Sequence, residues 1–158
     1  MMILNIILAL AESFFFQSYS ATGRVIAPEL NINVKVERSY HELLDAQSIT
    51  DDPSTACIYN YGDYSDHPYY DDSDIISDHN YQGFVNLHNA KPGMCLYYNG
   101  HKYICDIATI GHNTRDSNGY PALFVNGESW CQGYRQGLTL YTCRDNYANI
   151  SISRWKRL

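Results

Sequence analysis

Apolar and polar positions alternate in short runs along the 158-residue chain. In segments 23–36 and 137–143, apolar side chains recur at every second position, which is the period of a half-buried β-strand. Glycine, asparagine and aspartate gather between the apolar runs, where turns are favoured. The pattern therefore predicts an all-β-dominated fold of strands joined by loops.

The same pattern assigns the remaining elements. A serine cap at Ser39 with Glu42 three residues later predicts a short helix over 39–49. Asn99-Gly100 is a strong hairpin signal. Further strands are expected at 55–61, 74–77, 138–143 and 149–155, with a helical or irregular turn at 82–88. The polar, turn-rich segment 113–136 is expected to be one long loop of functional importance.

The first 22 residues differ from the rest of the chain because they are predominantly apolar. Ala9-Leu10-Ala11 resembles a signal-peptide cleavage site, although no lysine or arginine precedes Arg24. The apolar run is short for a membrane span. We interpret 1–22 as a degenerate signal or anchor, or as an amphipathic helix packing on the domain formed by 23–158.

Composition narrows the functional class. A net charge of -6 and a pI near 5.3 disfavour nucleic-acid binding, which needs a basic surface. Much of the acidic charge lies in 61–74, which we interpret as a solvated loop because it lacks the glycine and terminal glutamate of an EF-hand. We expect no metal and no cofactor.

The five cysteines form an odd set, so at least one cannot join an intramolecular disulfide. No C-x-x-C pair is present, which disfavours a zinc site. Cys95 and Cys105 flank the predicted hairpin and could be a disulfide or two buried free thiols.

Cys143 has a distinctive position at the end of a predicted strand. Alternation places Leu138 and Leu140 on one face with Thr142, and Thr139, Tyr141 and Cys143 on the other. If the leucines face the core, the Cys143 thiol can meet solvent or a ligand.

A reactive thiol needs a base and a donor for the developing oxyanion. His79 and His112 each follow a predicted strand and are the two candidate bases. The oxyanion donor is expected to be Arg154, with the alternatives Arg144 and Arg157. Arg154 shares strand parity with Ile150 and Ile152, so it lies at the charged end of an apolar groove or is redirected by a bulge.

These residues resemble a known family. The segment LTLYTC is similar to the T-L-x-T-C signature of sortases, with matches at Thr139, Leu140, Thr142 and Cys143. Similar order and spacing extend over Gly23 to Leu158, through the histidine and the residues that follow it: His79, Phe84, Leu87 and Lys91-Pro92-Gly93. The chain departs from the family pattern at Asp78, where glycine is familiar, and at Met94, where an acidic residue is.

The resemblance implies an eight-stranded β-barrel with short helices and a cysteine transpeptidase activity. Such an enzyme cleaves an LPxTG-like sorting signal and transfers it to an amine of a cell-wall precursor or pilin. An extracytoplasmic location at the cell membrane or cell wall is also implied, with the subclass open.

In this interpretation Cys143 is the nucleophile, His79 the acid and base, and Arg154 the group that holds the oxyanion or the substrate backbone. Tyr141, Thr142 and Ile152 are the expected substrate-binding residues. Two alternatives stay open: a cysteine hydrolase without an amine acceptor, and a non-catalytic extracellular binding module with structural cysteines.

Overall fold

The structure is a computed structural model that describes residues 23–39, 47–59, 74–115, 121–130, 134, 137–144 and 148–158. The apolar segment 1–22, most of the helix expected at 39–49 and nearly all of the acidic loop lie outside these residues, as does Cys131.

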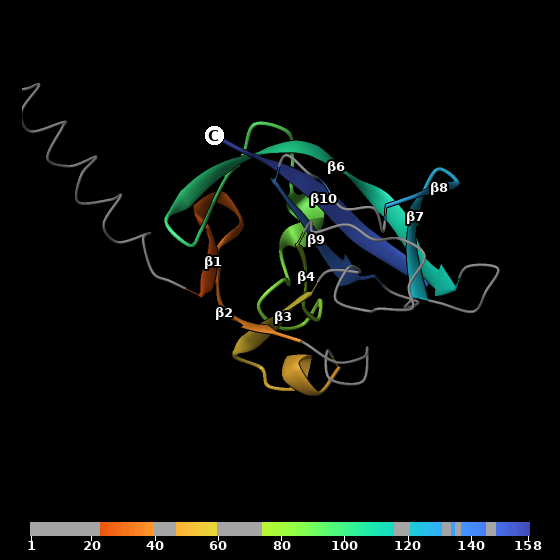
Figure 1. Cartoon of the computed structure of the whole chain (residues 1–158), viewed down its shortest axis with the longest axis horizontal. Helices are drawn as coiled ribbons and strands as arrows, with labels where there is room; N and C mark the ends of the chain where they lie inside the picture. Colours follow the sequence, from red (N-terminus) through yellow and green to blue (C-terminus); the bar gives the residue numbers. More distant parts are fainter. Residues whose placement is uncertain are drawn as a thin grey trace, which may run out of the picture.

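Eight strands close into a mixed β-barrel, as expected (Figure 1). The order is β10-β9-β4-β3-β2-β1-β5-β6, and pairing of β6 with β10 closes the ring. Two neighbouring pairs, β2 with β3 and β4 with β9, are parallel, whereas the others are antiparallel. The strands are β1 Arg24–Ala27, β2 Ile32–Arg38, β3 Thr55–Tyr59, β4 Ile75–Ser77, β5 Cys95–Tyr98, β6 His101–Arg115, β9 Gly137–Cys143 and β10 Asn149–Arg157.

Short helices and tight turns connect the strands. Helix η1 (Pro28–Leu30) separates β1 from β2, and η3 (Leu87–Asn89) lies between β4 and β5. Residues 47–50 are also helical. The predicted hairpin between β5 and β6 is confirmed, with Asn99 and Gly100 at φ 48° and 75°, the left-handed pair that a two-residue turn requires.

The expectation of one long loop over 113–136 is wrong. Strand β6 continues to Arg115, and β7 (Pro121–Val125) and β8 (Glu128–Ser129) form a second hairpin beside it. Asn126 and Gly127 turn this hairpin at φ 51° and 82°. This second Asn-Gly turn signal and the apolar run before it were missed in the sequence, because the residues around them are mostly polar.

Strand alternation divides the buried residues between two clusters. The larger one fills the barrel and includes Leu138 and Leu140 of β9, Ile76 of β4 and Trp155 of β10. The smaller one lies on the other face of the same strands, beneath β7, and includes Ile150, Ile152, Leu123 and Trp130. The predicted inward direction of the β9 leucines is confirmed.

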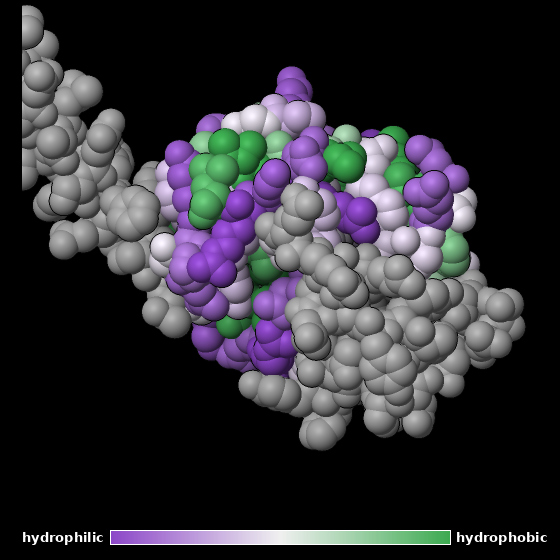
Figure 2. All heavy atoms as spheres, turned by 45° about the horizontal axis from the view of Figure 1, so that its top comes forward, coloured by the Kyte–Doolittle hydropathy of each residue, from purple (hydrophilic) through white to green (hydrophobic). Residues whose placement is uncertain are grey.

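The described cysteines are all free thiols: Cys57, Cys95, Cys105 and Cys143. Cys95 is the register partner of Ile104, so Cys105 lies one residue away from the position directly opposite Cys95. Cys105 is buried in the barrel core. The disulfide alternative for Cys95 and Cys105 is therefore wrong. On the face shown in Figure 2, apolar side chains form small patches separated by polar ones.

Candidate active site

Parallel pairing of β4 and β9 brings His79 and Cys143 to the same end of the barrel. Ser77 is the register partner of Tyr141, so His79 and Cys143 each lie two residues beyond a matched pair. The Thr142 hydroxyl donates to the Asp78 carbonyl at 2.7 Å, so the two segments stay side by side one residue beyond the last paired residues, Ser77 and Tyr141. Since side chains alternate, His79 and Cys143 share the outer face.

Cys143 is a half-buried free thiol. Burial raises its pKa above the usual value, because the thiolate is less well solvated there. Among the described residues no hydrogen bond joins its Sγ to His79.

The His79 imidazole contacts residues other than Cys143. Its Nε2 lies 3.3 Å from the Gln47 Nε2 and 3.9 Å from the Asp51 Oδ1, and its ring stacks on Tyr81 with centroids 4.9 Å apart. The side chain keeps 17% of its surface exposed.

The competing histidine lies on the wrong face. His112 pairs with Asn149, whereas Cys143 pairs with Ile150. His112 therefore shares the face opposite Cys143 and is exposed there. The alternative Arg157 is also distant, since it contacts His101 at the other end of β10.

Arg154 lies on the outer face but not beside Cys143. It pairs with Thr139, four residues before Cys143, a separation of about 13 Å along the strand. Its guanidinium carbon lies 4.0 Å from the Trp130 ring centroid and 5.5 Å from that of Tyr134. These cation–π contacts hold the guanidinium against Trp130 and Tyr134.

Arg154 keeps the strand parity of Ile150 and Ile152, and the bulge beside it does not redirect it. It ends the apolar row of Ile150 and Ile152 on the outer face. A register shift also occurs there, since Arg154 pairs with Ile107 but Trp155 with Cys105. The extra residue is Asp106 on β6, whose carboxylate accepts a hydrogen bond from the Tyr134 hydroxyl at 2.6 Å. The bulge thus redirects Asp106, which orients one of the rings that flank Arg154.

The three expected substrate-binding residues are largely enclosed. Thr142 and Ile152 are each 1% exposed, and the Thr142 hydroxyl is already used by Asp78. Tyr141 is half-buried and accepts a hydrogen bond from the Tyr59 hydroxyl at 3.0 Å. Burial raises the pKa of Tyr141 to about 12, so its phenol stays neutral. Of the three, Tyr141 alone keeps surface beside Cys143.

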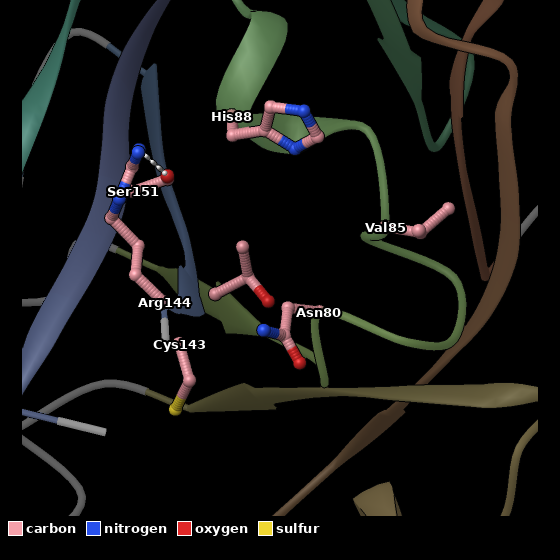
Figure 3. Close-up of a pocket in the computed structure, with 7 residues that line it drawn as sticks. Asn80, Val85, His88, Cys143, Arg144 and Ser151 are labelled. Carbon is pink, nitrogen blue, oxygen red and sulfur yellow. Dashed lines mark hydrogen bonds between the residues drawn. The ribbon is translucent and has the colours of Figure 1, made fainter. Parts of the chain in front are cut away.

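A pocket of about 250 Å³ lies at the end of β9, beside Cys143 (Figure 3). Its lining residues are Asn80, Val85, His88, Thr142, Cys143, Arg144 and Ser151. The Arg144 side chain extends to β10, where it donates a hydrogen bond to the Ser151 hydroxyl at 2.9 Å. The Cys143 sulfur points away from His88, so the thiol lies at the rim of the pocket (Figure 3).

No family model and no curated protein matches the sequence. Solved structures do match: sortase C-1 from Streptococcus pneumoniae, with 17% identity and a TM-score of 0.55, covers 86% of this chain. Sortase C from Clostridium perfringens has 14% identity and a TM-score of 0.53 over 87% of this chain. The chain has the sortase fold. It spans 66% of the streptococcal protein's length and 69% of the clostridial one's.

A sortase A from Corynebacterium diphtheriae also matches, at 14% identity, over 85% of this chain and 68% of its own, with a TM-score of 0.50. Matches to both sortase C and sortase A structures leave the subclass open. Within the described ranges, no helix is long and apolar enough to cross a membrane.

Several neighbours of His79 and Cys143 could not be identified from sequence. Gln47 and Asp51 contact His79 although they lie about 30 positions earlier, and no local pattern marks them. Asn80 and His88 line the pocket from the connection after β4. His88 had a detectable signal, since it follows Leu87 of the sortase-like motif, but its position on a turn concealed its direction.

Proposed function

We propose that the protein is a sortase-like cysteine transpeptidase. The observation that carries the proposal is the register of β4 and β9, which sets His79 and Cys143 in corresponding positions on one face, at the end of the T-L-x-T-C-like strand. The sortase fold supports the same assignment.

In the proposed reaction, the Cys143 thiolate attacks the carbonyl carbon of the scissile peptide. Collapse of the tetrahedral intermediate breaks the C–N bond, and the His79 imidazolium gives its proton to the leaving amine. A thioester remains on Cys143. An incoming amine then attacks the thioester, forms the new amide bond as the C–S bond breaks, and gives its proton to His79, which restores the thiolate–imidazolium pair.

The reactive state is a minority form. With ordinary pKa values of about 8.5 for cysteine and 6.5 for histidine, about one molecule in a hundred of the singly protonated pair is thiolate–imidazolium. Burial of Cys143 raises its pKa and reduces that fraction further in the free protein. We expect peptide binding to favour the ion pair by drawing His79 away from Gln47 and towards the thiol.

Arg154 is better suited to peptide binding than to the oxyanion. It pairs with Thr139, four residues before Cys143, and its guanidinium stacks on Trp130. Its several N–H donors can instead hold backbone carbonyls of an extended peptide on the outer face. The oxyanion then needs another donor, and the Arg144 backbone N–H is occupied by the Asn149 carbonyl at 2.8 Å.

The pocket beyond Cys143 offers a separate approach for the amine acceptor. Arg144 and His88 supply polar contacts there, on the side of β9 opposite to Arg154. A peptide donor on one side and an acceptor on the other would let both reach Cys143. We propose a sorting-signal peptide of a secreted protein as donor, a cell-wall precursor or pilin amine as acceptor, and an extracytoplasmic location.

The test is an acyl-transfer assay with a panel of LPxTG-like peptides, with and without an amine acceptor. Wild-type protein should release the leaving peptide and form an amine adduct, whereas Cys143→Ala should do neither. Release without any adduct, over a range of amines, would identify a hydrolase instead. Absence of Cys143-dependent release across the panel would contradict the proposal.

A further inference from the structure

Asp78 is a buried carboxylate directly before His79. It occupies the position where the sortase-like pattern has glycine, and only 5% of its surface is exposed. Because ionised carboxylates are rarely buried without partners, its surroundings need an explanation.

The Asp78 carboxylate contacts backbone N–H groups of the loop that follows it in the chain. Its Oδ1 accepts the backbone N–H of His79 at 2.7 Å, and the amides of Gly83 and Phe84 also face the carboxylate. The loop packs so tightly that a Cβ on Gly83 would lie 2.5 Å from Asp78 Oδ2. Glycine at position 83 therefore permits the loop to fold onto the carboxylate.

The same residue connects this loop to two other elements. With its amide oriented to satisfy its hydrogen bonds, Gln82 donates to Asp78 Oδ1 at 3.2 Å and to the Thr50 carbonyl at 3.0 Å. The Asp78 carbonyl accepts the Thr142 hydroxyl. Asp78 thus contacts the residue before Cys143, and through Gln82 it is tied to the helical turn that carries Gln47, a partner of His79.

We propose that Asp78 is a positioning residue, whose carboxylate fixes the 79–84 loop and thereby sets His79 opposite Cys143. The inference rests on the proposed function for its catalytic consequence. A displaced general acid costs rate rather than substrate affinity, since roughly 1 Å of misplacement can cost about a hundredfold.

The charge of Asp78 supports this role. Burial raises its pKa to about 6, although the backbone amides act in the opposite direction. The titratable groups nearby are His79 in the same loop, Asp51 beyond the His79 ring and Cys143 on β9. A carboxylate with this pKa changes its charge, and so its strength as an acceptor for the loop amides, near pH 6.

The experiment compares Asp78→Ala and Asp78→Asn with wild type, and uses the exposed Glu29→Gln as a charge-matched control. Asp78→Ala should lower kcat roughly tenfold to a hundredfold with KM within about twofold. Asp78→Asn keeps an oxygen for the His79 N–H, so at pH 8 its kcat should stay within about threefold of wild type, without the acidic inflection near pH 6.

A second readout needs no activity. The ring ¹⁵N signals of His79, identified by their loss in His79→Gln, should shift and broaden in Asp78→Ala but not in Glu29→Gln. Unchanged His79 signals and unchanged kcat in Asp78→Ala would overturn the proposal. A loss of kcat in Asp78→Asn at pH 8 equal to that in Asp78→Ala would also overturn it. Failure of the proposed function would instead appear as an inactive wild type, with the His79 signals still reporting on Asp78.

Discussion

The two faces of β9 differ although seven consecutive residues, Gly137–Cys143, supply both. Inward, Leu138 and Leu140 are 3% and 0% exposed and belong to the barrel core. Outward, Tyr141 and Cys143 keep part of their surface and lie beside the connection that carries His79. One strand therefore provides stability on one face and candidate chemistry on the other.

Side-chain direction, and not position along the strand, separates the structural residues of β9 from the candidate functional ones. Leu140 and Tyr141 are neighbours in sequence, yet they pack in different clusters. Substitutions of the outer-face candidate site residues should therefore alter the rate, whereas substitutions of the inward leucines should alter the free energy of unfolding.

The largest effect is expected on the outer face, in His79→Ala. Loss of the proposed acid and base should lower kcat/KM roughly 10³-fold, which corresponds to about 4 kcal/mol. The midpoint of thermal unfolding should change by no more than a few degrees, because Gln47, Asp51 and Tyr81, which the ring contacts, are exposed. Steady-state peptide cleavage and differential scanning fluorimetry measure the two quantities.

His112→Ala is the matched control for that variant. His112 lies on the opposite face, so kcat/KM should stay within about twofold of wild type. Full activity in His79→Ala combined with its loss in His112→Ala would contradict the assignment by register.

An inner-face substitution, Leu140→Ala, should show the reverse behaviour. Removing a fully buried leucine costs about 2–5 kcal/mol through lost burial and the remaining cavity. Urea unfolding should reveal the loss, while kcat per folded molecule at low temperature stays near the wild-type value. A large fall in kcat of the folded fraction would show that the two faces are not separable.

A smaller, pH-dependent effect is expected for Asp78→Asn. The folded-state pKa of about 6 lies above the ordinary 3.8, so the native state binds this proton more tightly than the unfolded state. Stability from this group is thus full below pH 4 and is lost as the pH rises through 6, by about 2–3 kcal/mol. Asparagine does not ionise, so the free energy of unfolding of the variant relative to wild type should increase by that amount between pH 4 and pH 8. An unchanged difference would refute burial as the cause of the raised pKa.

The smallest effect is expected for Arg154→Lys. Lysine keeps the charge but loses the planar stack on Trp130 and several donors, a change of about 1 kcal/mol. The KM for the peptide should rise about fivefold with kcat unchanged. A loss confined to kcat would instead indicate that Arg154 stabilises the oxyanion.

The sequence was sufficient for the strands with clear alternation and for the first Asn-Gly hairpin. It also predicted the inward direction of Leu138 and Leu140, because alternation alone determines it. It failed at 121–129, where a short apolar run and a second Asn-Gly turn lie within polar sequence. Local composition there outweighed the turn signal.

The surroundings of the site depend on contacts between distant segments. Nothing near His79 in sequence indicates Gln47 or Asp51, and strand parity alone could not show that Trp130 holds Arg154. Parity placed Arg154 on the correct face, but its distance from Cys143 depends on the register between β9 and β10. Register is a property of the assembled sheet.

The most direct test of the central claim is mass spectrometry of the acyl-enzyme. Wild-type protein is incubated with the LPxTG-like peptide panel without an amine acceptor, quenched in acid and digested. We expect the protein to gain the mass of the peptide's N-terminal fragment, as a thioester located on Cys143 and released by hydroxylamine. An adduct on another cysteine, or turnover in Cys143→Ala, would contradict it.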